Sequence, residues 1–178
     1  ALARRVAAAG TVLLKNDHDL LPLTATQQVG VVGAFAKLPR YQGAGSSYIN
    51  PTRLDTVYDT LVAHLGRDVA YAPGYQPRAK APDAALIAEA VALATQVEVV
   101  VLVVGLPDIY EAEGIDRTSM ALPASHDALV AAVVAANPRT VVVLCNGAPV
   151  EMPWHDQAPA IVEAYLGGQA GGGAIVDV

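Results

Sequence analysis

The sequence predicts an α/β fold, a three-layer sandwich in which a mostly parallel sheet is covered by helices on both faces. Two observations support this prediction. Short apolar runs alternate along the chain with segments of helical spacing, which is the rhythm of a parallel sheet. The composition is 53% hydrophobic and only 16% charged, whereas about a quarter of the residues of a soluble protein are usually charged. Strands buried on both faces need such apolar runs, and 178 residues suffice for one domain.

Six apolar runs are the predicted strands. The run at 98–104 is followed along the chain by the run at 140–145, and we expect these two at the centre of the sheet, where both faces are covered. The single cysteine, Cys145, lies in such a run and is predicted to be a small buried side chain. The six runs span residues 11–15, 29–34, 68–72, 98–104, 140–145 and 160–164.

Three segments between the strands have the apolar periodicity of helices. Asp83 follows Pro82 and is the predicted N-cap of the second helix, and Asn137-Pro138 ends the third. The chain also opens in a helical segment, and the glycine-rich stretch 167–173 opens another one at its end. We therefore expect a domain truncated at both ends, a fragment of a longer protein. The three helices are expected at 52–65, 83–95 and 124–137.

Charge and composition argue against several kinds of partner. The net charge is −6 and Lys and Arg are not clustered, so nucleic-acid binding is not expected. No apolar run approaches the roughly 20 residues that a membrane helix needs. No cofactor is indicated, and no metal, because the histidines lack ligand-like spacing and are expected at the surface or just beneath it. The sequence indicates no compartment. The histidines are His18, His64, His126 and His155.

A glycine-rich loop, residues 41–47, follows the predicted strand at 29–34. A dinucleotide-binding turn would need a third glycine and would begin directly at the strand end, so a phosphate cradle is disfavoured. Two readings stay open: a flexible turn, or a loop that touches a ligand through its backbone amides and Ser46 or Ser47. Trp154, further along the chain, is either a platform for a sugar ring or part of the core.

A second loop, residues 108–117, follows the predicted strand at 98–104 and holds three carboxylates and an arginine. A carboxyl group acts as a general acid near neutral pH only where its surroundings raise its pKa, which clustered like charges and burial both do. The sequence thus predicts different protonation states among the three, with the arginine pairing with the last. The alternative is an ordinary solvated loop. The four residues are Glu111, Glu113, Asp116 and Arg117.

The order of these stretches resembles one known family. Its most specific part is Glu-x-Glu-Gly-x-Asp-Arg at 111–117, followed by Leu-Pro at 122–123. The whole set is similar to the C-terminal domain of family 3 glycoside hydrolases, and the resemblance implies that residues 1–178 are this α/β sandwich domain. His126 stands where the family pattern commonly has Gln. The other matching segments are 9–16, 20–23, 29–33, 43–47, 71–74, 99–106, 146–150 and 152–154.

The resemblance implies a retaining, exo-acting β-glycosidase of the β-glucosidase type, which releases a terminal sugar from the non-reducing end of a β-glycoside substrate. Such enzymes use a carboxylate nucleophile and a carboxylic acid/base that lie roughly 5–5.5 Å apart. In the family the nucleophile is an aspartate on a preceding (β/α)8 barrel domain, which this chain lacks. The acid/base glutamate comes from the charged loop. Ser46 or Ser47 is expected near the sugar.

Matched to the family motif, Glu113 is the expected acid/base and Glu111 is the alternative. Asp116 and Arg117 are expected to brace the loop through a charge-assisted pair. Two other hypotheses stay open beside this one. The domain could shape a sugar site without supplying the acid, or it could bind a nucleotide or a flavin. The incomplete glycine pattern counts against the last hypothesis.

Overall fold

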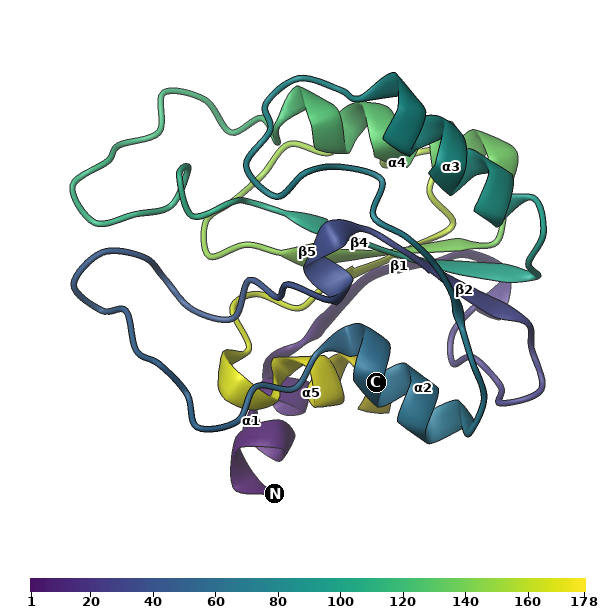
Figure 1. Ribbon diagram of the computed structural model, residues 1–178, viewed down its shortest axis with the longest axis horizontal. Helices are drawn as coiled ribbons and strands as arrows, with labels where there is room; N and C mark the ends of the chain where they lie inside the picture. Colours follow the sequence, from purple (N-terminus) through teal and green to yellow (C-terminus); the bar gives the residue numbers. More distant parts are fainter.

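The computed structural model describes residues 1–178 and contains one six-stranded sheet with helices on both faces (Figure 1). The strands are β1 (Val12–Asn16), β2 (Val29–Val32), β3 (Ala70–Ala72), β4 (Val99–Gly105), β5 (Thr140–Cys145) and β6 (Ala160–Glu163). The helices are α1 (Leu2–Gly10), α2 (Val57–Leu65), α3 (Ala84–Ala94), α4 (Ala124–Ala136) and α5 (Gly171–Asp177). Three short 3-10 helices are η1 (Asp17–Asp19), η2 (Ala34–Ala36) and η3 (Gly168–Ala170).

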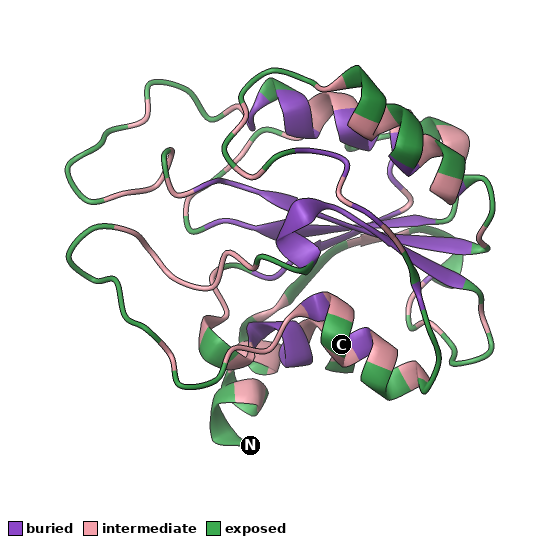
Figure 2. Cartoon of the chain, in the orientation of Figure 1, coloured by how far each residue is buried: buried purple, intermediate pink, exposed green.

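The sheet has the strand order β1-β6-β5-β4-β2-β3. All neighbouring pairs are parallel except β1 with β6, which is antiparallel, so the predicted mostly parallel sheet is confirmed. Every residue of β2, β4, β5 and β6 is buried (Figure 2). Apart from Thr140 and Glu163, their residues are apolar or glycine, as expected for strands that helices cover on both faces.

Two helices, α3 and α4, cover one face of the sheet, and α2 and α5 cover the other, with α1 packed beside α5 (Figure 1). Asp83 caps α3 as predicted, because its carboxylate accepts the backbone N–H groups of Ala85 and Leu86. Helix α2 begins at Val57 rather than at residue 52. Thr56 has an extended backbone and caps the helix by accepting the N–H of Asp59 at 2.9 Å.

The chain reverses its direction of travel across the sheet between β2 and β4, which are parallel neighbours. The connection after β2 leads to α2 on one face, whereas the connection after β4 leads to α4 on the other (Figure 1). Their loops, residues 33–56 and 106–123, therefore start from neighbouring strands at the carboxyl edge of the sheet and lead to helices on opposite faces. Open α/β sheets bind ligands at such a switch point. Both loops project beyond the sheet on the left of Figure 1.

Two aromatic predictions are resolved by burial. Trp154 is 3% exposed and donates its indole N–H to Asp127 Oδ1 at 2.9 Å, so it belongs to the core and is no sugar platform. His126 was expected at or near the surface, and this is wrong because the side chain is fully buried. Cys145 is buried as expected. None of the helices has both the length and the apolar character needed to cross a bilayer.

His126 packs against two aromatic side chains near the end of β4. Its ring centroid is 3.9 Å from that of Tyr75 and 5.5 Å from that of Phe35. Its Nδ1 accepts the N–H of Gly105 at 3.3 Å, while Nε2 is buried without a partner. Burial lowers the pKa of His126 from 6.5 to about 4. The folded chain therefore holds this imidazole neutral, while the unfolded chain takes up a proton as the pH falls below 6.5.

We expect His126 to make the chain acid-sensitive. Because its pKa is lower in the folded state, the stability it contributes is present above pH 6.5 and is lost as the pH falls toward 4. Between pH 7 and pH 4.5 this loss amounts to about 2 to 3 kcal/mol. His126→Gln should reduce the pH dependence of the free energy of unfolding by that amount, measured by urea denaturation at both pH values.

The matched control is His64→Gln, which changes an exposed histidine. Burial raises the pKa values of Asp127 and Glu163, and this stabilises the fold on acidification. Both carboxyls are present in every variant, so their effect cancels in the comparison. An identical pH dependence in the wild-type and His126→Gln chains would show that His126 is not the source of acid sensitivity.

Candidate active site

The two loops predicted to carry chemistry meet at the carboxyl edge of the sheet. Ala44 and Ala112 form an isolated parallel bridge, and the N–H of Glu113 donates to Ala44 O at 3.2 Å. Gly45 makes this approach possible. Its φ is +95°, and a Cβ at this position would lie 2.5 Å from the Cβ of Glu113. The glycine-rich loop therefore serves as the surface against which the charged loop lies, and not as a free turn.

Glu113 is exposed and is held through its carboxylate by Ser46. Its Oε2 accepts the N–H of Ser46 at 2.8 Å and also the hydroxyl of Ser46. Glu113 lines an open hollow of about 920 Å³ between the two loops and the loop after β5. A carboxyl group in this place can exchange a proton with a molecule bound in the hollow.

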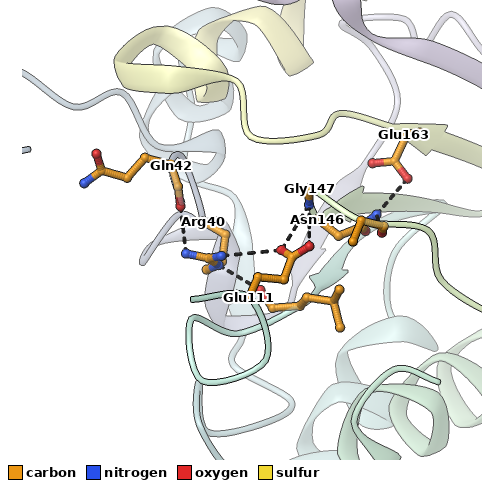
Figure 3. Close-up of polar contacts among 8 residues, drawn as sticks. Arg40, Gln42, Glu111, Asn146, Gly147 and Glu163 are labelled. Carbon is orange, nitrogen blue, oxygen red and sulfur yellow. Dashed lines mark hydrogen bonds and ion pairs between the residues drawn. The ribbon is translucent and has the colours of Figure 1, made fainter. Parts of the chain in front are cut away.

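Glu111 is less exposed than Glu113, and backbone and side-chain donors hold its carboxylate (Figure 3). Its two oxygens lie 2.9 and 3.0 Å from the N–H of Gly147, on the loop after β5. One oxygen also lies 3.5 Å from the guanidinium of Arg40, and the two side chains of this ion pair are only 9% and 11% exposed. The two glutamates of the motif thus have different environments, although one residue separates them.

A further carboxylate, Glu163, lies at the end of β6, on the other side of Asn146 from Glu111 (Figure 3). Its Oε2 accepts the side-chain amide of Asn146 at 3.1 Å, and its Oε1 accepts the N–H of Tyr165 at 3.0 Å. Asn146 also donates to Ala148 O at 3.1 Å. Burial raises the pKa of Glu163, and the charge of Glu111 adds to this, against the two hydrogen bonds. Glu163 and Asn146 together hold the loop that presents the N–H to Glu111.

The remaining predicted residues are arranged differently from the expectation. Arg117 does not pair with Asp116, which is exposed and forms no ion pair. Its guanidinium donates instead to the carbonyls of Ser119 at 3.1 Å and Pro149 at 2.8 Å. The arginine thus braces the loop through backbone oxygens. Ser47 is exposed and makes no hydrogen bond to the charged loop.

Four residues of this site were not identified from the sequence: Arg40, Asn146, Gly147 and Glu163. Two signals were available for some of them. Asn146-Gly147 directly follows the end of β5, at the same sheet edge as both loops, and Glu163 is a carboxylate within an apolar run. Arg40 directly precedes the glycine-rich loop, but nothing in its local sequence names a partner that lies 71 positions away. The chain contains no cluster of three His, Cys, Asp or Glu side chains able to hold a metal ion.

Comparison with known proteins gives one consistent result. Residues 11–178 match the family described as "Glycosyl hydrolase family 3 C-terminal domain". The chain is 49% identical to "Thermostable beta-glucosidase B" of Acetivibrio thermocellus, over 99% of this chain and 24% of that protein. It is 42% identical to "Exo-alpha-(1->6)-L-arabinopyranosidase" of Bifidobacterium longum, over 99% of this chain and 25% of that protein.

Solved structures agree in fold. The crystal structure of the GH3 β-glucosidase of Bifidobacterium adolescentis superimposes with a TM-score of 0.93 at 46% sequence identity, covering 99% of this chain and 26% of that one. The chain therefore spans about a quarter of the length of the relatives it matches. On the family match and these identities, the chain belongs to glycosyl hydrolase family 3, as its C-terminal α/β domain.

Proposed function

We propose that this chain forms one part of the active site of a retaining, exo-acting β-glycosidase of the β-glucosidase type and supplies its acid/base, Glu113. The nucleophile, an aspartate, would come from a preceding (β/α)8 barrel domain in the complete enzyme. The observation that carries the proposal is the placement of Glu113, exposed in the hollow and hydrogen-bonded to Ser46. The names of the relatives, two β-glucosidases and an arabinopyranosidase, support glycoside hydrolysis.

The reaction would proceed in two steps, with the two carboxyl groups roughly 5–5.5 Å apart. In the first step, Glu113 gives its proton to the glycosidic oxygen while the barrel aspartate attacks the anomeric carbon and the aglycone leaves. In the second, the Glu113 carboxylate takes a proton from the water that releases the sugar. The N–H and hydroxyl of Ser46 would orient the carboxylate in its ionised state.

Other residues take supporting roles in this proposal. Ser46 acts on Glu113 and not on the sugar, while Ser47, exposed beside it, remains the candidate for a sugar contact. Arg117 holds the charged loop to the loop after β5 through Pro149. Glu111 is the alternative acid/base, because it stands in the same motif and lines the same hollow.

The acid/base role of Glu113 is tested with Glu113→Ala in the full-length enzyme. Hydrolysis of an alkyl β-glucoside should fall by about 100- to 10,000-fold, because its leaving group needs a proton. The glycosylation step of a dinitrophenyl β-glucoside should change little, since that leaving group departs unaided. With the dinitrophenyl β-glucoside, azide should restore turnover by attacking the glycosyl-enzyme and give a β-glycosyl azide. Glu89→Ala, which removes an exposed glutamate from α3, is the matched control.

An equal loss with both substrates, or no loss with either, would remove Glu113 from the acid/base role. The same measurement on Glu111→Ala would then decide between the alternative glutamate and a domain that only shapes the sugar site. In the second case, neither variant would show dependence on the leaving group or rescue by azide.

Another prediction concerns the 178-residue chain by itself. It should not hydrolyse an aryl β-glucoside, because a retaining enzyme needs both carboxyl groups and the nucleophile is on the barrel. The measurement is release of nitrophenol by the pure, folded chain over many hours. Sustained turnover that scales with chain concentration and is lost in Glu113→Ala would contradict a site shared between two domains.

A further inference from the structure

Arg40 ties together segments that are far apart in the sequence (Figure 3). Its Nε donates to Leu106 O at 2.7 Å, just beyond β4, and its Nη1 donates to Gln42 O at 2.8 Å, in the glycine-rich loop. Its Nη2 lies 3.5 Å from Glu111. One guanidinium therefore contacts the start of the loop after β4, a glutamate further along that loop, and the glycine-rich loop.

Glu111 extends this connection to a third loop. Both of its oxygens face the single N–H of Gly147, after β5. Gly147 lies close to two side chains, since a Cβ there would lie 3.1 Å from Leu166 Cδ1 and 3.5 Å from Glu111 Oε1. Asn146 fixes the same turn from behind through Glu163. The loops after β2, β4 and β5 are thus joined through two nearly buried charged side chains.

We propose that Arg40, Glu111 and Gly147 form a clamp that positions Glu113, and that Glu111 is a positioning residue instead of the acid. This inference rests on the proposed role of Glu113. Only Ala112 separates the two glutamates, and Ala112 itself pairs with Ala44. Fixing Glu111 therefore fixes the backbone from which Glu113 reaches Ser46.

The hydrogen-bond partners and the low exposure of Glu111 favour a positioning role over proton transfer. Its oxygens already face an N–H and a guanidinium, and its side chain is 11% exposed. Both oxygens of Glu111 are thus engaged within the chain, whereas only one oxygen of Glu113 accepts hydrogen bonds. Glu113 is exposed and lines the hollow, and its carboxylate is hydrogen-bonded to Ser46.

The decisive kinetic comparison uses Glu111→Gln and Glu111→Ala in the full-length enzyme, with the alkyl β-glucoside. An amide keeps an oxygen that can accept the Gly147 N–H but cannot donate a proton as an acid does. A clamp predicts that kcat/KM falls about 100-fold in Glu111→Ala through misplacement of Glu113, and that Glu111→Gln recovers most of this loss. An acid predicts that both variants lose equal activity on the alkyl β-glucoside and that azide rescues both on the dinitrophenyl β-glucoside, which would overturn the proposal.

A double-mutant cycle tests the partnership. Arg40→Ala should lower kcat/KM as Glu111→Ala does, and the double variant should lose little more than the worse single one, because the two side chains act as a unit. The basic limb of the pH profile should remain in all three variants and should vanish only in Glu113→Ala. Additive losses would contradict the clamp. Retention of the limb in Glu113→Ala would instead contradict the proposed role of Glu113.

A third measurement needs no activity and separates the clamp from the proposed function. In ¹H–¹⁵N spectra of the full-length enzyme, labelled with ¹⁵N at glycine and serine, Glu111→Ala should shift the amide resonances of both Gly147 and Ser46, although no hydrogen bond joins Glu111 to Ser46. Glu111→Gln should shift them less, and Glu89→Gln should leave them unchanged. A shift at Gly147 with none at Ser46, in a chain whose circular dichroism is that of the wild type, would show that Glu111 does not position Glu113.

Discussion

The candidate site of this chain depends on one contact, the meeting of the loops after β2 and β4. The sheet places the starts of these loops side by side because β2 and β4 are parallel neighbours. The connections then lead to helices on opposite faces. The backbone of Gly45 then allows the charged loop to approach closely enough for Ala44 and Ala112 to pair. Without this approach, Ser46 and Glu113 would be exposed polar residues on separate loops.

Much of the fold could be predicted from the sequence because burial on both faces leaves a clear pattern. The apolar runs of β4 and β5 and the cap at Asp83 follow from local chemistry. The start of α2 was predicted too early because apolar spacing continues to residue 54, while Thr56 and Asp59 set the actual boundary. Periodicity identifies the face of a helix, but capping decides where the helix begins.

The site could be predicted only in part. Glu111, Glu113 and Ser46 stand in recognisable motifs, so the sequence singles them out as candidates, but it does not separate their environments. Those environments depend on partners such as Arg40 and Gly147, which are adjacent only because of strand order and register. For the same reason the partner of Arg117 was predicted wrongly. A neighbouring carboxylate seemed the natural choice, but the fold brings the carbonyl of Pro149 to the guanidinium.

The hollow that Glu113 lines is open on its outer side. A proton donor for glycosidic bonds works best where water is excluded, and this chain does not provide that shelter by itself. On the proposed function, the part of the enzyme that closes the hollow would also give Glu113 the shelter from water that a proton donor needs. Assembly of the two domains would then control activity, because an enzyme that is misassembled or cut between its domains would not hydrolyse a glycoside.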